Sequence, residues 1–420
     1  MATLITPPSP SSRPAPRPGH DPRLDDVADK VEGGTRLTPE DGLALYRTPD
    51  LWRVCELADT VRRRRHGDVA YYNINRHLNY SNVCALSCSF CDFYAKRGEA
   101  KAYTRDMDYV REQARLAVAA GATEIHSVGG LHPYLPFEYY TDLVRTIRET
   151  ARGLGSDLHV KAFTAVEIVH LARIARVYRG SDPAAGIRWV LERLIEAGLG
   201  SLPGGGAEVF DDRVHDEAFR GKIRSDVWLE VHRVAHELGL CTNATILYGH
   251  IEDARERLVH MDLLRRAQDA ALERGGGGRF QTIIPLPFIP DGSGLGHLAG
   301  PGGLENLRTL AVARLMLDNF AHVKAFWIMQ TLPMAQLMLG CGADDLDGTV
   351  VWYDITKLPG AAPGGPDGAG PEAPATHQEV SVFALRRAIR EAGFRPVERD
   401  TLYRPVRREG QRWWVQADGP

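Results

Sequence analysis

Three cysteines that lie close together in one short segment are the residues of this chain best suited to metal chemistry. Cys84, Cys88 and Cys91 form a C-x₃-C-x₂-C array within the segment NINRHLNYSNVCALSCSFCDFY. Thiolates at this spacing can bind three corners of one cubane iron–sulfur cluster, which leaves one iron without a protein ligand. We therefore predict a [4Fe–4S] cluster at these cysteines.

An iron without a protein ligand has a chemical consequence. It can bind the amino and carboxylate groups of S-adenosylmethionine (SAM), and the reduced cluster can then split the sulfonium to give a 5′-deoxyadenosyl radical. The alternative is a zinc site, which normally needs a fourth Cys or His. His77 is the only nearby candidate, and it precedes the first cysteine. Phe90, directly before Cys91, fits a loop that shields a cluster from water, so the pattern favours the cluster.

The bulk composition excludes several other classes of protein. Six cysteines in 420 residues are too sparse for a disulfide scaffold, and Cys55, Cys241 and Cys341 have no partners at ligand spacing. We interpret these three as ordinary buried or incidental thiols. A formal net charge of −3 gives no global basic field that would collect nucleic acid. No stretch has the character of a membrane span or signal peptide, so we expect a cytoplasmic protein with no membrane partner.

A folded frame must position the cysteine segment, and short apolar runs alternate along the chain with segments of helical period. This pattern predicts an α/β fold of repeated βα units. The expected strands are Tyr71–Asn75, Glu124–Val128, His159–Thr164, Ser201–Leu202, Thr242–Tyr248, Phe280–Leu286, Val323–Met329 and Leu346–Val351. The expected helices are Asp106–Ala120, Phe137–Arg152, Glu167–Val177, Ile187–Ala197, Asp226–Leu238, Ala254–Glu273 and Asn306–Asn319. About eight strands match a (β/α)₈ TIM-like barrel, with a doubly wound sheet as the alternative.

Changes in composition divide the chain into segments. A Pro-, Ser- and Arg-rich start predicts a disordered tail at residues 1–21, and a Pro- and Gly-rich stretch predicts a flexible linker at 358–378. We expect an N-terminal helical extension at 22–70, the barrel at 71–357 and a C-terminal extension at 379–420. Within the last, Val380–Glu391 has helical spacing and Pro396–Arg404 an extended pattern.

The pentapeptide HVKAF occurs twice, at His159–Phe163 and at His322–Phe326. In a strand, Lys161 and Lys324 would share one face with the flanking His and Phe residues, while the Val and Ala residues would take the other. The apolar face should meet helices. Both lysines should therefore point into the barrel, although a buried Lys can equally pair with a structural carboxylate.

The C-x₃-C-x-F-C pattern after the first strand resembles the radical SAM superfamily. The segment SVGGLHP after the second strand is similar to the Gly-rich turn with which that superfamily holds the amino group of SAM. Gly129 and Gly130 would let backbone carbonyls approach this group; the alternative is a plain βα turn. The resemblance implies a radical SAM (β/α)₈ barrel, extended here at both ends, with the [4Fe–4S] cluster and SAM as cofactors.

Further motifs narrow the resemblance to the aminofutalosine synthase family of menaquinone biosynthesis. They are INRHLNYSNVC, GATEIHSVGGLHPYLPFEYY, HVKAFTAVEI, GLGSLPGGGAEVF, NATILYGHIE, RLMLDNF, GADDLDGTVV and PVERDTLY. The family's reaction adds the adenosyl radical to the methylene carbon of 3-[(1-carboxyvinyl)oxy]benzoate. Aryl migration and loss of a carboxyl group then give aminofutalosine, methionine and bicarbonate. The implied partner is an electron donor of the flavodoxin or ferredoxin type.

A site for adenosine, methionine and a dianionic aromatic substrate needs close backbone, cations and aromatic rings. Gly204, Gly205 and Gly206 allow close backbone approach, and Glu208 could accept from ribose hydroxyls, although a helix-start turn is equally consistent with Glu208. Arg76 and Lys161 are candidates for the substrate carboxylates. Candidates at strand ends are His132, Tyr248 and His250, for which a structural role is the alternative, and Asp344, Asp345 and Asp347 could cap a helix or orient a ligand.

One departure from the family pattern leaves other functions open. The segment after GADDLDGTVV reads YDITK, which puts Lys357 where the family has His. The rivals are a hydrogen-abstracting radical SAM cyclase (dehypoxanthine futalosine cyclase), a deazaflavin cofactor synthase relative, and a non-catalytic metal-binding interaction module. The segments VGGLHP and PGGGAEVF favour the synthase. Release of 5′-deoxyadenosine, as opposed to its incorporation, would indicate the cyclase.

Overall fold

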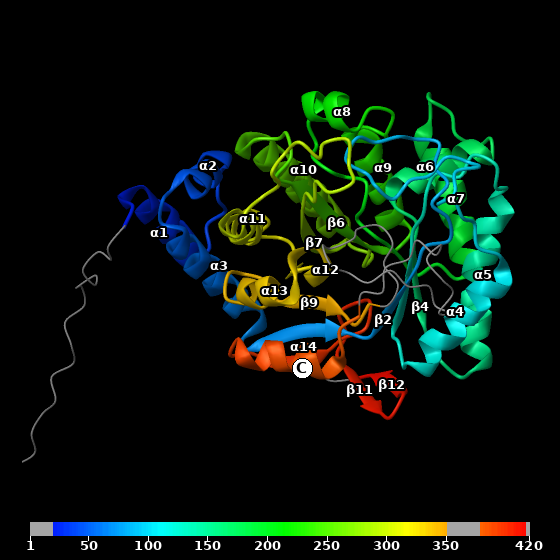
Figure 1. Ribbon diagram of the computed structural model, residues 1–420. Helices are drawn as coiled ribbons and strands as arrows, with labels where there is room; N and C mark the ends of the chain where they lie inside the picture. The colour runs from blue at the N-terminus through cyan, green and yellow to red at the C-terminus, as the bar shows by residue number, and fades with distance from the viewer. Residues whose placement is uncertain (1–19, 351–378, 417–420) are drawn as a thin grey trace, which may run out of the picture.

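A parallel β-sheet forms the centre of the molecule in the computed structural model, which describes residues 20–350 and 379–416 (Figure 1). The strands are β1 (Val69–Asn73), β2 (Asn75–Leu78), β3 (Glu124–Ser127), β4 (His159–Ala162), β5 (Ser201–Leu202), β6 (Cys241–Tyr248), β7 (Phe280–Pro287), β8 (His322–Val323), β9 (Asp345–Gly348), β10 (Arg395–Glu398), β11 (Val406–Glu409) and β12 (Arg412–Val415). Strands β2 to β8 form a seven-stranded sheet in sequence order, with every pair parallel.

The sheet closes on itself through β9. A parallel bridge joins Lys324, just after β8, to Asp345 at the start of β9. Strand β9 then pairs in parallel with β1, and β1 runs on into β2 past Ile74. Counting β1 and β2 as one strand position, the closed ring has eight. The predicted (β/α)₈ TIM-like barrel is confirmed, and the doubly wound alternative is wrong.

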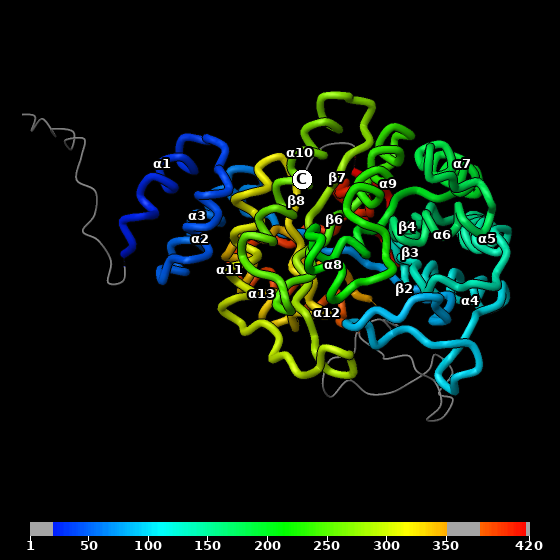
Figure 2. The backbone as a smooth tube through the Cα atoms, turned by 90° about the horizontal axis from the view of Figure 1, so that it is seen from above, coloured from blue at the N-terminus to red at the C-terminus, as the bar shows by residue number. Residues whose placement is uncertain are grey.

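Helices cover the outside of the barrel, and Figure 2 shows α4 to α7 as an arc outside β2, β3 and β4. The helices between β2 and β9 are α4 (Met107–Ala119), α5 (Phe137–Gly153), α6 (Ala165–Ile174), α7 (Pro183–Ala197), α8 (Asp212–Ala218), α9 (Ser225–Glu237), α10 (Ala254–Arg274), α11 (Gly303–Met316), α12 (Trp327–Gln330) and α13 (Leu332–Leu339). Capping boxes at Thr164 and Asp253 fix where α6 and α10 begin, because each cap and its Glu three residues later satisfy each other's backbone N–H groups. Each expected helix is present, while α8, α12 and α13 were not predicted.

Segments from both ends of the chain extend the barrel. At the amino end, η1 (Pro22–Leu24), α1 (Asp25–Gly33), α2 (Pro39–Arg47) and α3 (Leu51–His66) lie on one side, with α3 packed against α11. At the carboxyl end, α14 (Val382–Glu391) leads into β10, which adds a third parallel strand beside β1. The antiparallel pair β11–β12 follows. The expected helix near the carboxyl end is confirmed. The expected extended segment Pro396–Arg404 is confirmed only as far as Glu398, because residues 401–403 form a turn.

Three strand predictions are wrong in part. The expected strand Leu346–Val351 ends at Gly348, and Val351 lies outside the described residues. The expected strand Tyr71–Asn75 is the junction of β1 and β2, and the expected strand Val323–Met329 ends at Val323 because α12 begins at Trp327. A short apolar run such as AFWIM fits a buried helix as well as a strand. The linker at 358–378, the departure at Asp354–Lys357 and most of the tail at 1–21 lie outside the described residues. Asp21 is described, and it is buried and caps η1.

The repeated HVKAF segments direct both lysines into the barrel, as predicted. Lys161 and Lys324 are buried and line the same internal cavity, while the Val and Ala residues of both copies are buried in the hydrophobic core. The copies differ at their Phe residues. Phe163 has a φ of 63°, which breaks the strand period and turns its ring onto Tyr80 and Tyr140, whereas Phe326 lines the cavity.

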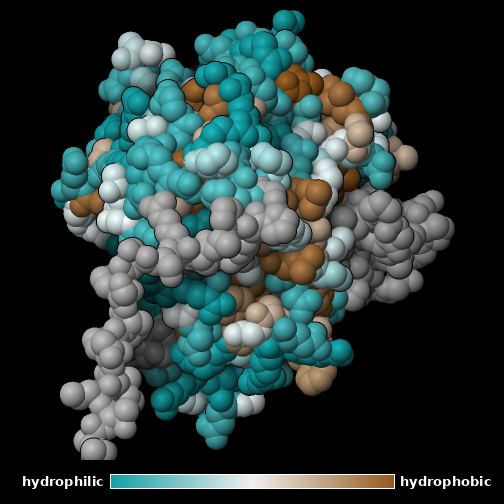
Figure 3. All heavy atoms as spheres, turned by 90° about the vertical axis from the view of Figure 1, so that its left-hand side faces the viewer, coloured by the Kyte–Doolittle hydropathy of each residue, from teal (hydrophilic) through white to brown (hydrophobic). Residues whose placement is uncertain are grey.

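Among the described residues, no helix is both long and apolar enough to cross a membrane. The face drawn in Figure 3 is mainly hydrophilic, with hydrophobic side chains in separate patches.

Candidate active site

A cavity of about 550 Å³ opens at the carboxyl ends of the barrel strands and reaches into the barrel. This volume lies within the range of small-molecule sites. Three segments form its mouth: the cysteine loop (residues 84–94), the first glycine turn (Gly129–Gly130) after β3 and the second glycine turn (Gly204–Gly206) after β5. The structure thus brings all three predicted cysteines to one cavity with the predicted glycines, Glu208 and Lys161.

Backbone hydrogen bonds hold the cysteine loop. The amide of Cys84 donates to the Ala95 carbonyl at 3.0 Å, and the amide of Cys91 donates to the Cys88 carbonyl at 3.1 Å. The Lys96 ammonium donates to the carbonyls of Cys84 at 3.0 Å and Leu86 at 2.8 Å. The Cys84 sulfur also accepts from the Leu131 amide at 3.4 Å, and all three thiols line the cavity.

The environment of the thiols fits a cluster with several irons. Burial raises the pKa of Cys88 to about 11, so the site disfavours a free thiolate and gains from a bound metal that neutralises it. The three cysteine sulfurs lie too far apart to bind one ion together. Within residues 20–350 and 379–416, the group of three metal-binding side chains whose ligand atoms all lie within 4.8 Å of one another is His66, His322 and Asp344, and it contains no cysteine. His77 lies inside the barrel with its ring 4.5 Å from that of His126. The cluster fits better than zinc.

The first glycine turn lies against the chain that leads into the cysteine loop. A Cβ on Gly129 would lie 2.6 Å from the Tyr80 ring, and one on Gly130 would lie 2.4 Å from the Val83 carbonyl oxygen. Only glycine allows this approach without displacement of the backbone. The Gly130 amide donates to the Ser81 carbonyl at 2.8 Å, so the turn and the cysteine loop form one unit.

Glu167, which sequence reasoning missed, ties this turn to the start of α6. Its carboxylate accepts from the Gly129 amide at 3.0 Å, the Tyr80 hydroxyl at 2.7 Å and the Thr164 amide at 2.8 Å. Burial raises the pKa of Glu167 to about 7 despite these donors. The T-x-x-E capping-box pattern at Thr164 was the signal that could have identified it.

The second glycine turn leads to a buried ion pair. Glu208, whose φ is 47°, pairs with Lys222, and both side chains are largely buried. The Lys222 ammonium lies 4.6 Å from the centre of the Phe90 ring in the cysteine loop. Burial lowers the pKa of Lys222, but the Glu208 carboxylate and the Cys88 thiol raise it by more. Lys222 was not predicted, and it places a cation beside the thiols.

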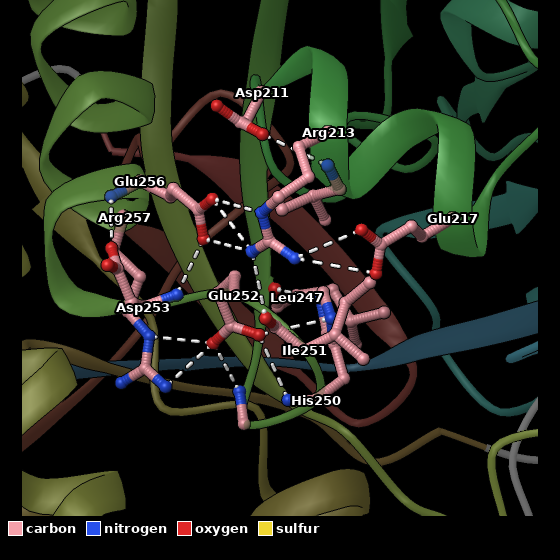
Figure 4. Close-up of polar contacts among 12 residues, drawn as sticks. Asp211, Arg213, Glu217, Leu247, His250, Ile251, Glu252, Asp253, Glu256 and Arg257 are labelled. Atoms are coloured by element: carbon pink, nitrogen blue, oxygen red, sulfur yellow. Dashed lines mark hydrogen bonds and ion pairs between the residues drawn. The ribbon is translucent and has the colours of Figure 1, made fainter.

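The chain between Glu208 and Lys222 contains α8, and a polar network anchors it to α10 (Figure 4). Arg213 on α8 donates to Glu256 on α10 at 2.7 Å and to the Ile251 carbonyl at 3.0 Å. Glu252 accepts from the Gly249 amide at 2.6 Å and from Arg257 at 2.7 Å. The network therefore fixes the segment that carries Glu208 and Lys222.

Strand side chains inside the barrel form the deepest part of the cavity, which we call the floor: His126, Lys161, Lys324 and Asp347. Lys161 pairs with Glu124 at 2.6 Å and Lys324 pairs with Asp347 at 2.5 Å. His126 lies three residues before Gly129 along the same segment, so it lies below the mouth. His126 and Lys324 are further cavity residues that the sequence analysis does not name as site residues.

Two predicted site residues point away from the cavity. Arg76 donates to the side-chain oxygen of Gln113 on α4 at 2.7 Å and 2.9 Å. The strand period explains this, because its neighbour His77 faces inward and Arg76 must face the helices. The His132 ring accepts from the amides of Tyr134 and Leu135, both at 3.2 Å, and so stabilises the turn before α5.

Tyr248 and His250 also lie outside the cavity. The Tyr248 hydroxyl donates to Asn306 and accepts from Gln330, both at 2.9 Å, within the core. The His250 ring contacts the Leu247 carbonyl at 3.1 Å and belongs to the network of Figure 4. Both side chains make hydrogen bonds within the fold and do not line the cavity.

The three aspartates near β9 do not cap a helix, and each of them forms an ion pair. Asp344 pairs with Arg314 and lies 2.6 Å from His322; Asp345 pairs with Arg399 at 2.6 Å. Asp347 is the one that lines the cavity.

The barrel, the three-cysteine loop and the glycine turns define a radical SAM enzyme. The Radical SAM superfamily model matches residues 78–264, and the CofH/MqnC C-terminal region model matches residues 278–411. Methylornithine synthase (PylB) has a similar fold, with a TM-score of 0.64 at 19% identity over 88% of this chain and 97% of that chain. The chain belongs to the radical SAM superfamily, in the group that carries this C-terminal region.

Two relatives of the chain are enzymes with different activities. The chain is 45% identical to the aminodeoxyfutalosine synthase of Thermus thermophilus, over 92% of this chain and 97% of the relative. It is also 37% identical to the 5-amino-6-(D-ribitylamino)uracil--L-tyrosine 4-hydroxyphenyl transferase of Methanosphaerula palustris, over 80% of this chain and 89% of the relative. Enzymes of the superfamily use a [4Fe–4S] cluster and SAM, and so does this chain. Cys84, Cys88 and Cys91 are the residues that fit as ligands.

Proposed function

We propose that this enzyme makes aminofutalosine for menaquinone biosynthesis. In the proposed reaction, SAM, 3-[(1-carboxyvinyl)oxy]benzoate and water give aminofutalosine, methionine and bicarbonate. A carbon–carbon bond forms between the SAM 5′-carbon and the vinyl methylene, and the carbon–sulfur bond of SAM breaks. The aryl group migrates from oxygen to carbon, a carboxyl group leaves, and the electron that starts the reaction is returned, so the sum is redox-neutral.

The observation that carries this proposal is the single cavity that joins the cysteine loop to a lysine-bearing floor. When bound, the reduced cluster supplies a 5′-deoxyadenosyl radical from SAM. The glycine turns can hold SAM because their backbone lies open to the cavity, and Glu208 can accept from ribose hydroxyls. Lysines at the floor suit a substrate with two carboxylates. The similarity to aminodeoxyfutalosine synthases supports the same assignment.

The residues around the radical must exclude water and position the alkene. The glycine turns have no Cβ atoms, so their backbone can pack closely around a bound ligand. The rings of Phe90, Phe288 and Phe326 line the cavity. Holding the vinyl methylene next to the 5′-carbon favours addition over hydrogen abstraction, since a pre-oriented pair reacts as if at high effective concentration. Addition also gives a radical flanked by an ether oxygen and a carboxylate, which stabilise it together.

Isotope labelling tests the proposal. Reconstituted protein, dithionite, 5′-¹³C SAM and the enolpyruvyl benzoate are mixed under anaerobic conditions and analysed by mass spectrometry. We expect the label in aminofutalosine, bonded to the former vinyl carbon. Label found only in free 5′-deoxyadenosine, with the benzoate unchanged, would reject the synthase and leave the radical SAM class in place.

We also propose a flavodoxin or ferredoxin as electron donor, and a cytoplasmic location, since such carriers supply low-potential electrons there. Replacing dithionite by a flavodoxin with its reductase should sustain turnover. Failure with both carriers, under conditions where dithionite works, would reject this partner.

A further inference from the structure

The floor of the cavity contains two buried lysines that approach from opposite sides of the barrel. Lys161 comes from β4, and Lys324 follows β8, so the two HVKAF copies face each other across the barrel interior. Their side chains are only 5% and 3% exposed. Such lysines are stable as cations only when anions lie close by.

The charges around them balance. The cations are Lys161, Lys324 and Arg399, and the anions are Glu124, Asp345 and Asp347. In the described part of the chain, the carboxylate in ion-pair contact with Lys161 is Glu124, and the one in contact with Lys324 is Asp347. An ammonium has three N–H donors, so each lysine retains donors beyond its one carboxylate. The floor is therefore compensated in charge but not saturated in hydrogen bonds.

His126 adds a further unused polar atom. It pairs in register with Lys161 across β3 and β4, so both side chains face the barrel interior at the same level. Its Nε2 atom is buried and has no hydrogen-bond partner among the residues that the structure describes. A buried nitrogen without a partner is unfavourable unless a ligand or water satisfies it.

The side chains of the floor are not fully enclosed by other protein atoms, because they border the cavity. His126, Lys161, Lys324 and Asp347 line the same cavity as the cysteine loop. Below them, Arg399 and the segment up to Tyr403 seal the other end of the barrel: Arg399 pairs with Asp345, and the Tyr403 ring stacks 3.6 Å from His322. The unused polar groups therefore border the cavity that the cysteine loop also lines.

We propose that His126, Lys161 and Lys324 form a carboxylate subsite that binds the benzoate carboxylate of the substrate. This inference rests on the proposed function for the identity of the substrate. The vinyl methylene must lie beside the SAM 5′-carbon at the mouth, and the enol carboxylate is attached to the neighbouring carbon. The benzoate carboxylate is the far end of the molecule, so it alone can reach the floor. The substrate thus enters with its ring carboxylate first.

Binding of isophthalate (benzene-1,3-dicarboxylate) to the reconstituted protein tests the subsite without catalysis. Removing one lysine would strand a buried carboxylate, so the variants remove a pair: Lys161→Met with Glu124→Gln, and Lys324→Met with Asp347→Asn. We expect calorimetry to show about 10- to 100-fold weaker isophthalate binding in each, as for loss of a charged hydrogen bond. His126→Leu should weaken it by a smaller factor. Neutral isophthalamide should bind poorly to every variant.

The pair Lys222→Met with Glu208→Gln is the matched control. Lys222 is also buried, ion-paired and in the cavity, but it lies at the mouth. This control should leave isophthalate affinity within about twofold while lowering SAM affinity. Unchanged isophthalate affinity in both double variants of the floor, with thermal melts like the parent, would overturn the subsite. If aminofutalosine is not formed but isophthalate binding still depends on both lysines, the subsite stands and the proposed function fails.

Discussion

The mouth and the floor of the cavity are built on different principles. The mouth is made of loops whose peptide groups set the shape: the first glycine turn lies within contact of the Ser81–Val83 backbone, and Lys96 binds loop carbonyls. The floor is made of strand side chains whose charges compensate one another, as Lys161 does with Glu124. Changes at the mouth should therefore affect cofactor binding first, whereas changes at the floor should affect stability and substrate binding.

The difference also separates what is local from what depends on the fold. The cysteine loop and the first glycine turn are each contiguous in sequence. The floor combines residues from β3, β4 and β9 with Lys324, which are far apart along the chain. Its charge balance exists only when the barrel closes.

The largest expected effect is at the mouth. Changing any one of Cys84, Cys88 and Cys91 to Ala should abolish the cluster, because the remaining two thiolates hold too few irons. Iron and sulfide analysis after anaerobic reconstitution should fall from about four irons per chain to near zero. Cys241→Ala is the matched control, since its thiol donates to the Gly277 carbonyl outside the cavity and its loss should leave iron content unchanged. Stoichiometric zinc in folded, iron-free protein would contradict the assignment.

At the floor, Lys161→Met alone should destabilise the fold. It leaves the fully buried Glu124 carboxylate without its ion-pair partner, and breaking a buried pair typically lowers the free energy of unfolding by about 3–5 kcal/mol. Adding Glu124→Gln should restore most of this loss. Urea unfolding measures both. Equal stability of the single variant and the parent would show that the floor is more hydrated than its burial indicates.

Sequence reasoning was accurate where neighbours in sequence are neighbours in space. The cysteine array follows from spacing, the direction of Lys161 from the strand period, and the role of the Gly129–Gly130 turn from the resemblance to the radical SAM superfamily. The structure places all of them at the cavity. The charge of Arg76 suits a substrate carboxylate, but the same period that turns Lys161 inward turns Arg76 outward toward Gln113.

Other residues could not be placed without the fold. The partners of Tyr248 are Asn306 and Gln330, and those of Glu208 include Lys222 beyond α8, so tertiary contacts decide which polar group faces the cavity. The strand error at Val323–Met329 has a related cause: Trp327 begins α12 and donates to the Gly348 carbonyl at 2.8 Å, a contact supplied by another strand.

Glycine substitutions should separate the two turns of the mouth. Gly130→Ala places a Cβ 2.4 Å from the Val83 carbonyl, next to Cys84, so it should weaken SAM binding by about tenfold or more and also reduce iron content. In Gly205→Ala the nearest atom is the flexible Thr164 Cγ2 at 3.0 Å, and the effect should be smaller. Equilibrium dialysis with SAM and iron analysis compare the two. Equal losses in both variants would remove the distinction.

The smallest expected effect is a dependence of stability on pH. Burial lowers the pKa of His77 and His159, both inside the barrel, to about 4, so the folded chain keeps them neutral while the unfolded chain protonates them near pH 6.5. Stability is therefore full above about pH 6.5 and falls as the pH drops toward 4. Each histidine should lower the free energy of unfolding by roughly 1–2 kcal/mol between pH 7 and pH 5. Urea unfolding at the two pH values measures this.

Glu167 at the mouth should act in the opposite direction. The pKa of Glu167 is raised to about 7, so the folded chain binds a proton here at a higher pH than the unfolded chain does. The free energy of unfolding therefore increases as the pH falls from 7 toward 4.5. The gain in the free energy of unfolding from this carboxyl should offset the loss from about one histidine. Glu167→Gln should thus steepen the loss of stability at pH 5, and His77→Leu should make it shallower. If both variants shift the pH dependence in the same direction, the opposite pKa shifts of Glu167 and His77 are wrong, because only opposite shifts in the folded state give opposite slopes.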